Sequence, residues 1–125
     1  MKETDIQKAV IKWSQQASVR RAFPDLKMLY HIPNERLCSG RQGMELKRMG
    51  VKKGVPDLCL PVPSKGFHGL YLELKTKTGK PSDEQLWWIS ELQARGYMTA
   101  ICYSYEEAIN TLIAYLSGKD YKNGC

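Results

Sequence analysis

The chain has 125 residues, a formal net charge of +6 at pH 7 and 42% hydrophobic residues, proportions that belong to a globular domain and exclude a disordered chain. No run approaches the roughly 18 apolar residues of a membrane span, and the opening "MKETDIQKAV" lacks the apolar core of a signal peptide. We expect a single domain over residues 1–118, a frayed tail over 119–125, no membrane partner and an intracellular location, the host cytoplasm if the protein is viral.

Hydrophobic periodicity and turn residues divide the chain into helices and strands. The predicted elements, in chain order, are a helix over 4–17, a strand over 26–32, a short helix near 44–49, strands over 55–62 and 69–76, a helix over 83–95, a strand over 97–104 and a helix over 105–117. Capping-box spacings, Thr4 with Gln7 and Ser82 with Gln85, mark two of the helix starts. The main order α-β-β-β-α-β-α predicts an α/β domain with a mixed sheet and helices on both faces.

Two carboxylates and an ammonium group stand on strands that are otherwise apolar. In "GLYLELK", Glu73 and Lys75 share the face opposite the leucines, because side chains alternate along a strand. Asp57 opens the preceding strand, so a hairpin brings it alongside Glu73. The plain alternative is a solvated row, in which Glu73 and Lys75 form a surface salt bridge and Asp57 closes a turn.

The chemical interpretation of these residues is a divalent metal site. Two partly buried carboxylates repel each other, and a proton or a cation relieves that repulsion. Oxygen ligands suit Mg²⁺, which binds through one or two carboxylates while the substrate supplies phosphate oxygens. The ion would polarise the phosphoryl group, and Lys75 would position the attacking water or neutralise developing charge.

The positive charge of the chain is concentrated just before Asp57. Between residues 36 and 53 there are six basic residues against one acid, and the connection that carries them is long for a compact domain. A solvated face explains such a segment without any function, but its position favours a polyanionic partner. The predicted nucleic-acid contacts are Asn34, Arg36, Arg41, Lys47, Arg48, Lys52 and Lys53.

Taken together, these motifs resemble the VRR-NUC (virus-type replication-repair nuclease) domain of the PD-(D/E)xK nuclease superfamily. The matching segments are "ETDIQ", "IPN", "KRMGVKKG", "GVPDL", "ELK" and "SDEQ". The resemblance implies a restriction-endonuclease-like mixed sheet and phosphodiester cleavage that depends on Mg²⁺ or Mn²⁺. It assigns catalytic roles to Asp57, Glu73, Lys75 and Gln85, and metal ligation to Asp57, Glu73, Glu3 and the backbone carbonyl of Leu74.

Two of these assignments have purely structural alternatives. Glu3 would be favourable simply as a negative charge at the N-terminus of a helix, where the helix dipole is positive. Gln85 can be the partner of Ser82 in its capping box, and this role is compatible with a catalytic one.

The favoured function is a structure-selective endonuclease that cuts branched DNA. This follows from the resemblance, because free-standing viral members of that family resemble homodimeric Holliday-junction resolvases. Trp87 lies off the apolar stripe of its helix, so it either contacts a second copy or packs within the monomer. The alternatives are a non-catalytic nucleic-acid-binding module of the same fold, or a nuclease of the same superfamily that acts on linear duplex or RNA.

Overall fold

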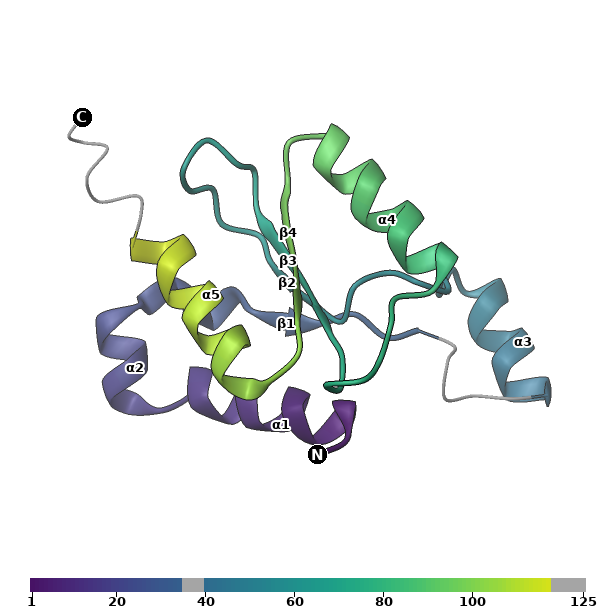
Figure 1. The fold of residues 1–125 in the computed structure, drawn as a ribbon, viewed down its shortest axis with the longest axis horizontal. Coiled ribbons are helices and arrows are strands. Elements are labelled where there is room, and N and C mark those ends of the chain that lie inside the picture. Colours follow the sequence, from purple (N-terminus) through teal and green to yellow (C-terminus); the bar gives the residue numbers. More distant parts are fainter. Residues whose placement is uncertain (35–39, 118–125) are drawn as a thin grey trace.

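A four-stranded mixed sheet forms the centre of the computed structural model, which describes residues 1–34 and 40–117 (Figure 1). The strands are β1 (Tyr30–His31), β2 (Leu58–Leu60), β3 (Leu70–Leu74) and β4 (Met98–Cys102), in the spatial order β1-β2-β3-β4. β2 pairs antiparallel with both β1 and β3, whereas β3 and β4 pair in parallel. The parallel pair requires a crossover, and α4 supplies it. The predicted mixed α/β sheet is confirmed.

Helices cover both faces of the sheet, as the sequence predicted. They are α1 (Glu3–Ser14), α2 (Ala17–Ala22), the 3-10 helix η1 (Pro24–Met28), α3 (Gly40–Arg48), α4 (Asp83–Ala94) and α5 (Tyr105–Ser117). In Figure 1, α1, α2 and α5 lie on one side of the strands and α4 lies on the other, with α3 beyond the N-terminal end of α4. None of the helices within the described ranges is both long and apolar enough to cross a membrane.

The leucines of β2 and β3 form the core against α1 and α5. Leu58 and Leu72 are partners across the two strands, and each is at most 1% exposed. The same buried cluster includes Val10 of α1 and Leu112 of α5. The predicted leucine face of β3 is therefore confirmed, and it leaves the opposite face of the same strands for polar side chains.

Tyr115 ties the end of α5 to the connection between β2 and β3. Its hydroxyl donates to the carbonyl oxygen of Val62 at 2.6 Å, and Ser64 Oγ donates to the Tyr115 carbonyl at 2.6 Å. The side chain is fully buried. Burial raises the pKa of Tyr115 to about 12, because the phenolate would lose its hydration.

This raised pKa predicts a loss of stability at alkaline pH. Below pH 10 the phenol is neutral in both states, but between about pH 10 and 12 only the unfolded chain ionises, so the free energy of unfolding falls as pH rises. Tyr115→Phe should show a shallower fall over this range. It should also be less stable at pH 7 by about 1–2 kcal/mol, because the buried Val62 carbonyl loses its donor. Urea unfolding at several pH values tests both expectations. If the free energy of unfolding of Tyr115→Phe falls with pH as steeply as that of wild type, the first expectation is contradicted.

Four local predictions were wrong or incomplete. The helix predicted over 4–17 ends at Ser14, and a separate helix, α2, begins at Ala17. The strand predicted over 26–32 is restricted to residues 30–31, because Pro24 starts η1 and this helix takes up the first half of the segment. α1 begins one residue before Thr4, and the Lys2 backbone amide donates to the Asp5 carboxylate at 3.2 Å, so its cap is not the predicted Thr4–Gln7 pair. The short helix predicted near 44–49 spans Gly40–Arg48.

The domain limits 1–118 remain a prediction, since residues 118–125 lie outside the described part.

Candidate active site

The register of β2 and β3 brings Asp57 and Glu73 together. Leu58 faces Leu72 and Cys59 faces Tyr71, so the same alignment continued by one residue sets Asp57 opposite Glu73. Both carboxylates lie on the face of the sheet opposite the leucine side chains, and the Asp57 and Glu73 residues are 2% and 1% exposed respectively. This excludes the solvated-row alternative for these two residues, because a solvated carboxylate is exposed.

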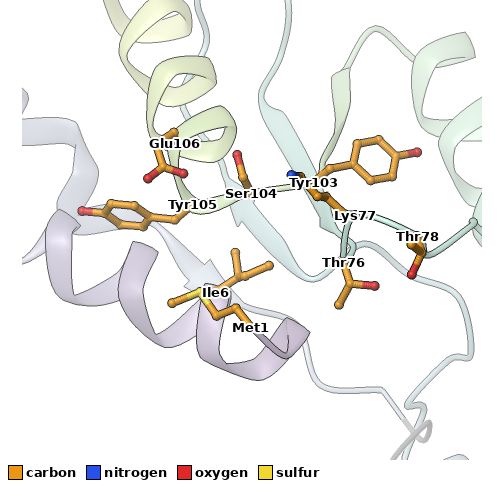
Figure 2. Close-up of a pocket in the computed structure, with 9 residues that line it drawn as sticks. All are labelled: Met1, Ile6, Thr76, Lys77, Thr78, Tyr103, Ser104, Tyr105 and Glu106. Atoms are coloured by element: carbon orange, nitrogen blue, oxygen red, sulfur yellow. The ribbon is translucent and has the colours of Figure 1, made fainter.

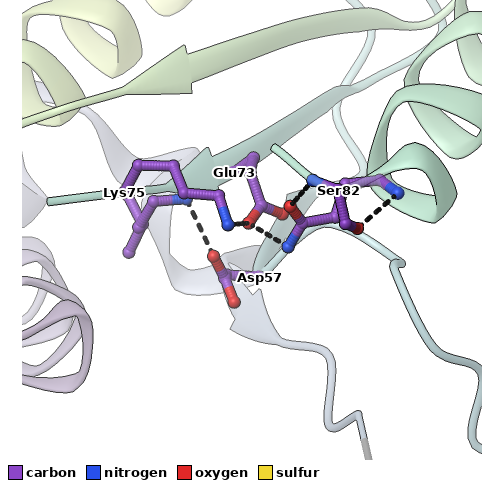
Figure 3. Close-up of polar contacts among 6 residues, drawn as sticks. Asp57, Glu73, Lys75 and Ser82 are labelled. Atoms are coloured by element: carbon purple, nitrogen blue, oxygen red, sulfur yellow. Dashed lines mark hydrogen bonds and ion pairs between the residues drawn. The ribbon is translucent and has the colours of Figure 1, made fainter. Parts of the chain in front are cut away.

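Asp57 is fixed at both its side chain and its backbone. Its Oδ2 accepts a hydrogen bond of 2.8 Å from the backbone amide of Leu74, so the carboxylate lies close to the residue between Glu73 and Lys75 (Figure 3). Its carbonyl oxygen accepts the Ile32 amide at 2.8 Å. The same carbonyl lies 2.9 Å from His31 Nδ1, which must be the donor because a carbonyl can only accept. The short strand β1 and the residue that follows it thus hold Asp57 in place.

Glu73 is the centre of the polar contacts drawn in Figure 3. Lys75 Nζ lies 3.7 Å from Glu73 Oε2, with the side chains of Lys75 and Glu73 only 8% and 1% exposed. Gln85 Nε2 donates to the same Oε2 at 2.8 Å. The second carboxylate oxygen, Oε1, is buried as well. The buried Glu73 carboxylate is thereby held against one cation and one neutral donor.

The capping box of α4 determines which way the Gln85 amide points. Gln85 Oε1 accepts the backbone amide of Ser82 at 2.8 Å, and the Gln85 backbone amide donates to Ser82 Oγ at 3.1 Å. Since the amide oxygen is used by Ser82, the NH₂ group is the end that faces Glu73. The capping role predicted from the sequence and a contact of Gln85 with a site carboxylate therefore occur together.

Five of the six predicted basic contacts lie on and after α3, at the N-terminal end of α4 (Figure 1). The exposed members are Arg41, Lys47, Arg48, Lys52 and Lys53. α3 buries none of its residues, so the core does not require this helix. Lys53 Nζ lies 3.9 Å from the Glu84 carboxylate of α4, which links this segment to the helix that carries Gln85. Asn34 is half-buried, and Arg36 lies outside the described residues.

The donor chemistry fits a hard divalent cation in part. Asp57, Glu73 and the Leu74 carbonyl offer oxygen atoms only, which is the ligand type that Mg²⁺ and Mn²⁺ prefer. Within residues 1–34 and 40–117, however, no group of three or more His, Cys, Asp or Glu side chains is arranged to hold a metal. Glu3, half-buried in the first turn of α1, therefore does not complete a three-carboxylate cluster with the other two, and its role as a ligand stays a prediction.

A separate cavity of about 440 Å³ opens near the carboxyl ends of β3 and β4 (Figure 2). Met1 and Ile6 of the α1 region form one side of it, and the segments 76–78 and 103–106 form the others. None of the predicted catalytic side chains lines it, although Thr76 directly follows Lys75. No sequence pattern predicted this cavity, because its three lining segments are far apart along the chain and share no spacing.

Comparison with known proteins identifies the family. A family model described as the VRR-NUC domain matches residues 1–106. A solved structure described as a "VRR_NUC domain protein" is 26% identical to this chain, with a TM-score of 0.77 over 94% of this chain and 90% of that chain. No curated protein matches the chain. From the family match and the shared fold, we conclude that the chain belongs to the VRR-NUC domain family, which generally comprises nucleases.

Proposed function

We propose that this protein is a Mg²⁺- or Mn²⁺-dependent endonuclease that hydrolyses phosphodiesters in branched DNA. The observation that supports it most is the meeting of two buried carboxylates and one buried ammonium group, Asp57, Glu73 and Lys75, at one place on the sheet. Burying three charges is costly, and stability alone gives no reason for it. Such clusters of buried ionisable groups are characteristic of catalytic sites.

Each residue has a distinct part in this mechanism. Asp57, Glu73 and the carbonyl of Leu74 would hold the cation, which when bound supplies Lewis-acid polarisation of the scissile phosphate. Lys75 donates from its ammonium group to the attacking water or to the phosphoryl oxygens as negative charge develops there. Gln85 keeps the Glu73 carboxylate in one orientation through its 2.8 Å hydrogen bond, so it acts on the substrate only through Glu73.

The basic residues of α3 and the segment that follows it would hold the phosphates beside the cut. This predicts binding that weakens as salt increases, with a log–log slope of about −0.9 for each phosphate neutralised on duplex DNA. Lys47→Ala combined with Arg48→Ala should weaken binding and make the slope less steep by about 1.8. Arg21→Ala combined with Lys27→Ala is the matched control, because both side chains are exposed and lie near α2, away from α3. Fluorescence anisotropy at several salt concentrations measures both pairs, and equal slopes would contradict the assignment.

A homodimer would suit paired incisions across a four-way junction. Leu86 and Trp87 are 47% and 58% exposed on α4, so the monomer leaves an apolar surface there and Trp87 is not used in its core. Aromatic residues are enriched at protein interfaces. Sedimentation at micromolar concentration should give twice the 14.3 kDa of one chain, and Trp87→Glu should shift the protein to monomer. A wild-type monomer would exclude the symmetric arrangement but not the nuclease.

The decisive experiment compares DNA substrates. Four-way junction, flap, linear duplex and single-stranded DNA, together with an RNA duplex, are incubated with the protein in Mg²⁺, in Mn²⁺ and in EDTA. We expect metal-dependent cleavage with the highest rate on a branched substrate. Cleavage of linear duplex or RNA at an equal rate would favour the broader nuclease alternative, and tight binding without cleavage in either metal would favour the non-catalytic binding module.

A further inference from the structure

Gly54 lies at a point where the chain leaves no room for a side chain. It precedes Asp57 by three residues, is buried, and has a φ of +91°. A Cβ atom built on it would lie 2.7 Å from Glu84 Cβ, 2.8 Å from the Glu84 carbonyl carbon and 3.0 Å from the Gln85 backbone nitrogen. Two of these three atoms are backbone, so rotation of a side chain cannot relieve the clash.

The atoms that Gly54 touches belong to the first turn of α4, which carries Gln85. This turn is defined by the Ser82 capping box, and the Gln85 amide extends from it to Glu73 Oε2 at 2.8 Å. The neighbouring Lys53 lies 3.9 Å from the Glu84 carboxylate, so it faces the same turn. A continuous series of contacts therefore runs from Gly54 through α4 to the Glu73 carboxylate.

We propose that Gly54 is a positioning residue for the catalytic site. Its missing side chain allows the segment that enters β2 to press against the first turn of α4, and this sets the Gln85 amide at hydrogen-bond distance from Glu73. The inference rests on the proposed function insofar as Glu73 serves the reaction. It goes beyond that function by assigning a role to a residue that cannot touch the substrate through any side chain.

The size of the displacement explains why one methyl group matters. Ordinary carbon–carbon contact needs about 3.5 Å, so a Cβ at 2.7 Å requires the helix or the segment to move by about 0.8 Å or more. A hydrogen bond of 2.8 Å lengthened by that amount is no longer a good one. Loss of such a supporting contact typically lowers metal affinity or activity by about 10- to 100-fold.

Gly66 supplies a matched control for the backbone. Its φ of +87° is close to the +91° of Gly54, so alanine meets an unfavourable positive φ at both positions. Apart from Gly66 itself and its two chain neighbours, no heavy atom of the described residues lies within 4 Å of where the Cβ of residue 66 would be. Gly54→Ala and Gly66→Ala therefore share the conformational penalty, and only Gly54→Ala adds the clash with α4.

The first measurement needs neither metal nor cleavage. In ¹⁵N-labelled protein, the side-chain NH₂ of Gln85 is expected to show the shift and slow hydrogen exchange of a buried, hydrogen-bonded amide. Gly54→Ala should move this signal and speed its exchange at least 10-fold, whereas Gly66→Ala should leave it as in wild type. An unchanged Gln85 signal in folded Gly54→Ala protein would overturn the proposal, whatever the protein cleaves.

The second measurement is a double-mutant cycle on cleavage. Gly54→Ala should lower kcat about 10-fold or more with the KM for DNA changed less than about 3-fold. On a Gln85→Ala background, Gly54→Ala should cause little further loss, because the contact it disrupts is already gone. Independent, additive losses would overturn the proposal. If wild type cleaves no substrate, the proposed function fails, and the Gln85 signal still decides the role of Gly54.

Discussion

Replacing Asp57 by asparagine is expected to abolish cleavage while leaving the fold at least as stable as wild type. Loss of a supporting residue around a metal typically costs about 10- to 100-fold, so loss of a charged ligand should cost more than about 100-fold. Stability should not fall, because the side-chain oxygen of asparagine can still accept the 2.8 Å hydrogen bond from the Leu74 backbone amide. Removing one of two neighbouring buried carboxylates also relieves their repulsion, which should stabilise the chain by about 1 kcal/mol.

Two measurements on the same samples test this expectation. Cleavage is measured at saturating DNA across a range of Mg²⁺ and Mn²⁺ concentrations, and the free energy of unfolding is measured in urea without metal. Glu106→Gln is the control, because it removes one exposed carboxylate near the start of α5. An Asp57→Asn variant that keeps more than a tenth of wild-type activity would end the assignment of Asp57 as a ligand. A strongly destabilised variant would mean that Asp57 is retained for the fold.

The part of the candidate site that follows from strand alternation, hairpin pairing and helix capping could be predicted from the sequence. Alternation along β3 alone sets Glu73 and Lys75 opposite the leucines, and hairpin pairing brings Asp57 to Glu73. The spacing of Ser82 and Gln85 is a local signal for a helix start, and the hydrogen bonds of the capping box follow it. These features depend on neighbours within a few residues or on a single strand pairing.

The rest depends on contacts between distant segments. The hydrogen bond between Gln85 and Glu73 requires α4 to start beside the end of β3, and no spacing in the sequence encodes that position. The close approach of Gly54 to Glu84 joins residues thirty positions apart. A glycine in front of "VPD" was visible in the sequence, but a positive φ explains a glycine equally well without any contact.

The error at residues 26–32 has a different cause. Alternating apolar residues favoured a strand, but a short apolar run is ambiguous between strand and helix. Pro24 is well suited to a first helical position, and the 3-10 helix that begins there buries Leu26 in the core. Only Tyr30 and His31 form a strand that pairs with β2, and the Ile32 amide that follows them joins His31 in holding the Asp57 carbonyl.

Replacing Glu73 by glutamine is expected to lower the free energy of unfolding by about 3 kcal/mol, as well as to abolish cleavage. Glutamine keeps the size of the side chain and an acceptor oxygen, but it leaves the buried Lys75 ammonium group without the carboxylate that lies 3.7 Å away. Breaking a buried pair typically costs about 3–5 kcal/mol. The low end of that range applies because the Asp57 carboxylate remains on the same face of the sheet.

Combining Glu73→Gln with Lys75→Met separates stability from catalysis. Lys75→Met alone removes the ammonium group that lies 3.7 Å from the buried Glu73 carboxylate, so it should also destabilise the chain. The double variant buries no unmatched charge at this pair, and it should recover about 2 kcal/mol relative to the sum of the single losses. All three variants should remain inactive, because recovery of stability does not restore the ammonium donor or the charged ligand.

An exposed ion pair on the same molecule provides the comparison for this cycle. Arg95 and Glu91 approach within 2.7 Å, closer than Lys75 and Glu73, but their side chains are 65% and 39% exposed. Water screens such a pair, so the corresponding cycle of Glu91→Gln with Arg95→Met should give a coupling below about 1 kcal/mol. A buried coupling no larger than this exposed one would mean that Lys75 and Glu73 are hydrated in solution. In that case the site would not have the low dielectric that makes a buried ammonium group effective against developing phosphoryl charge.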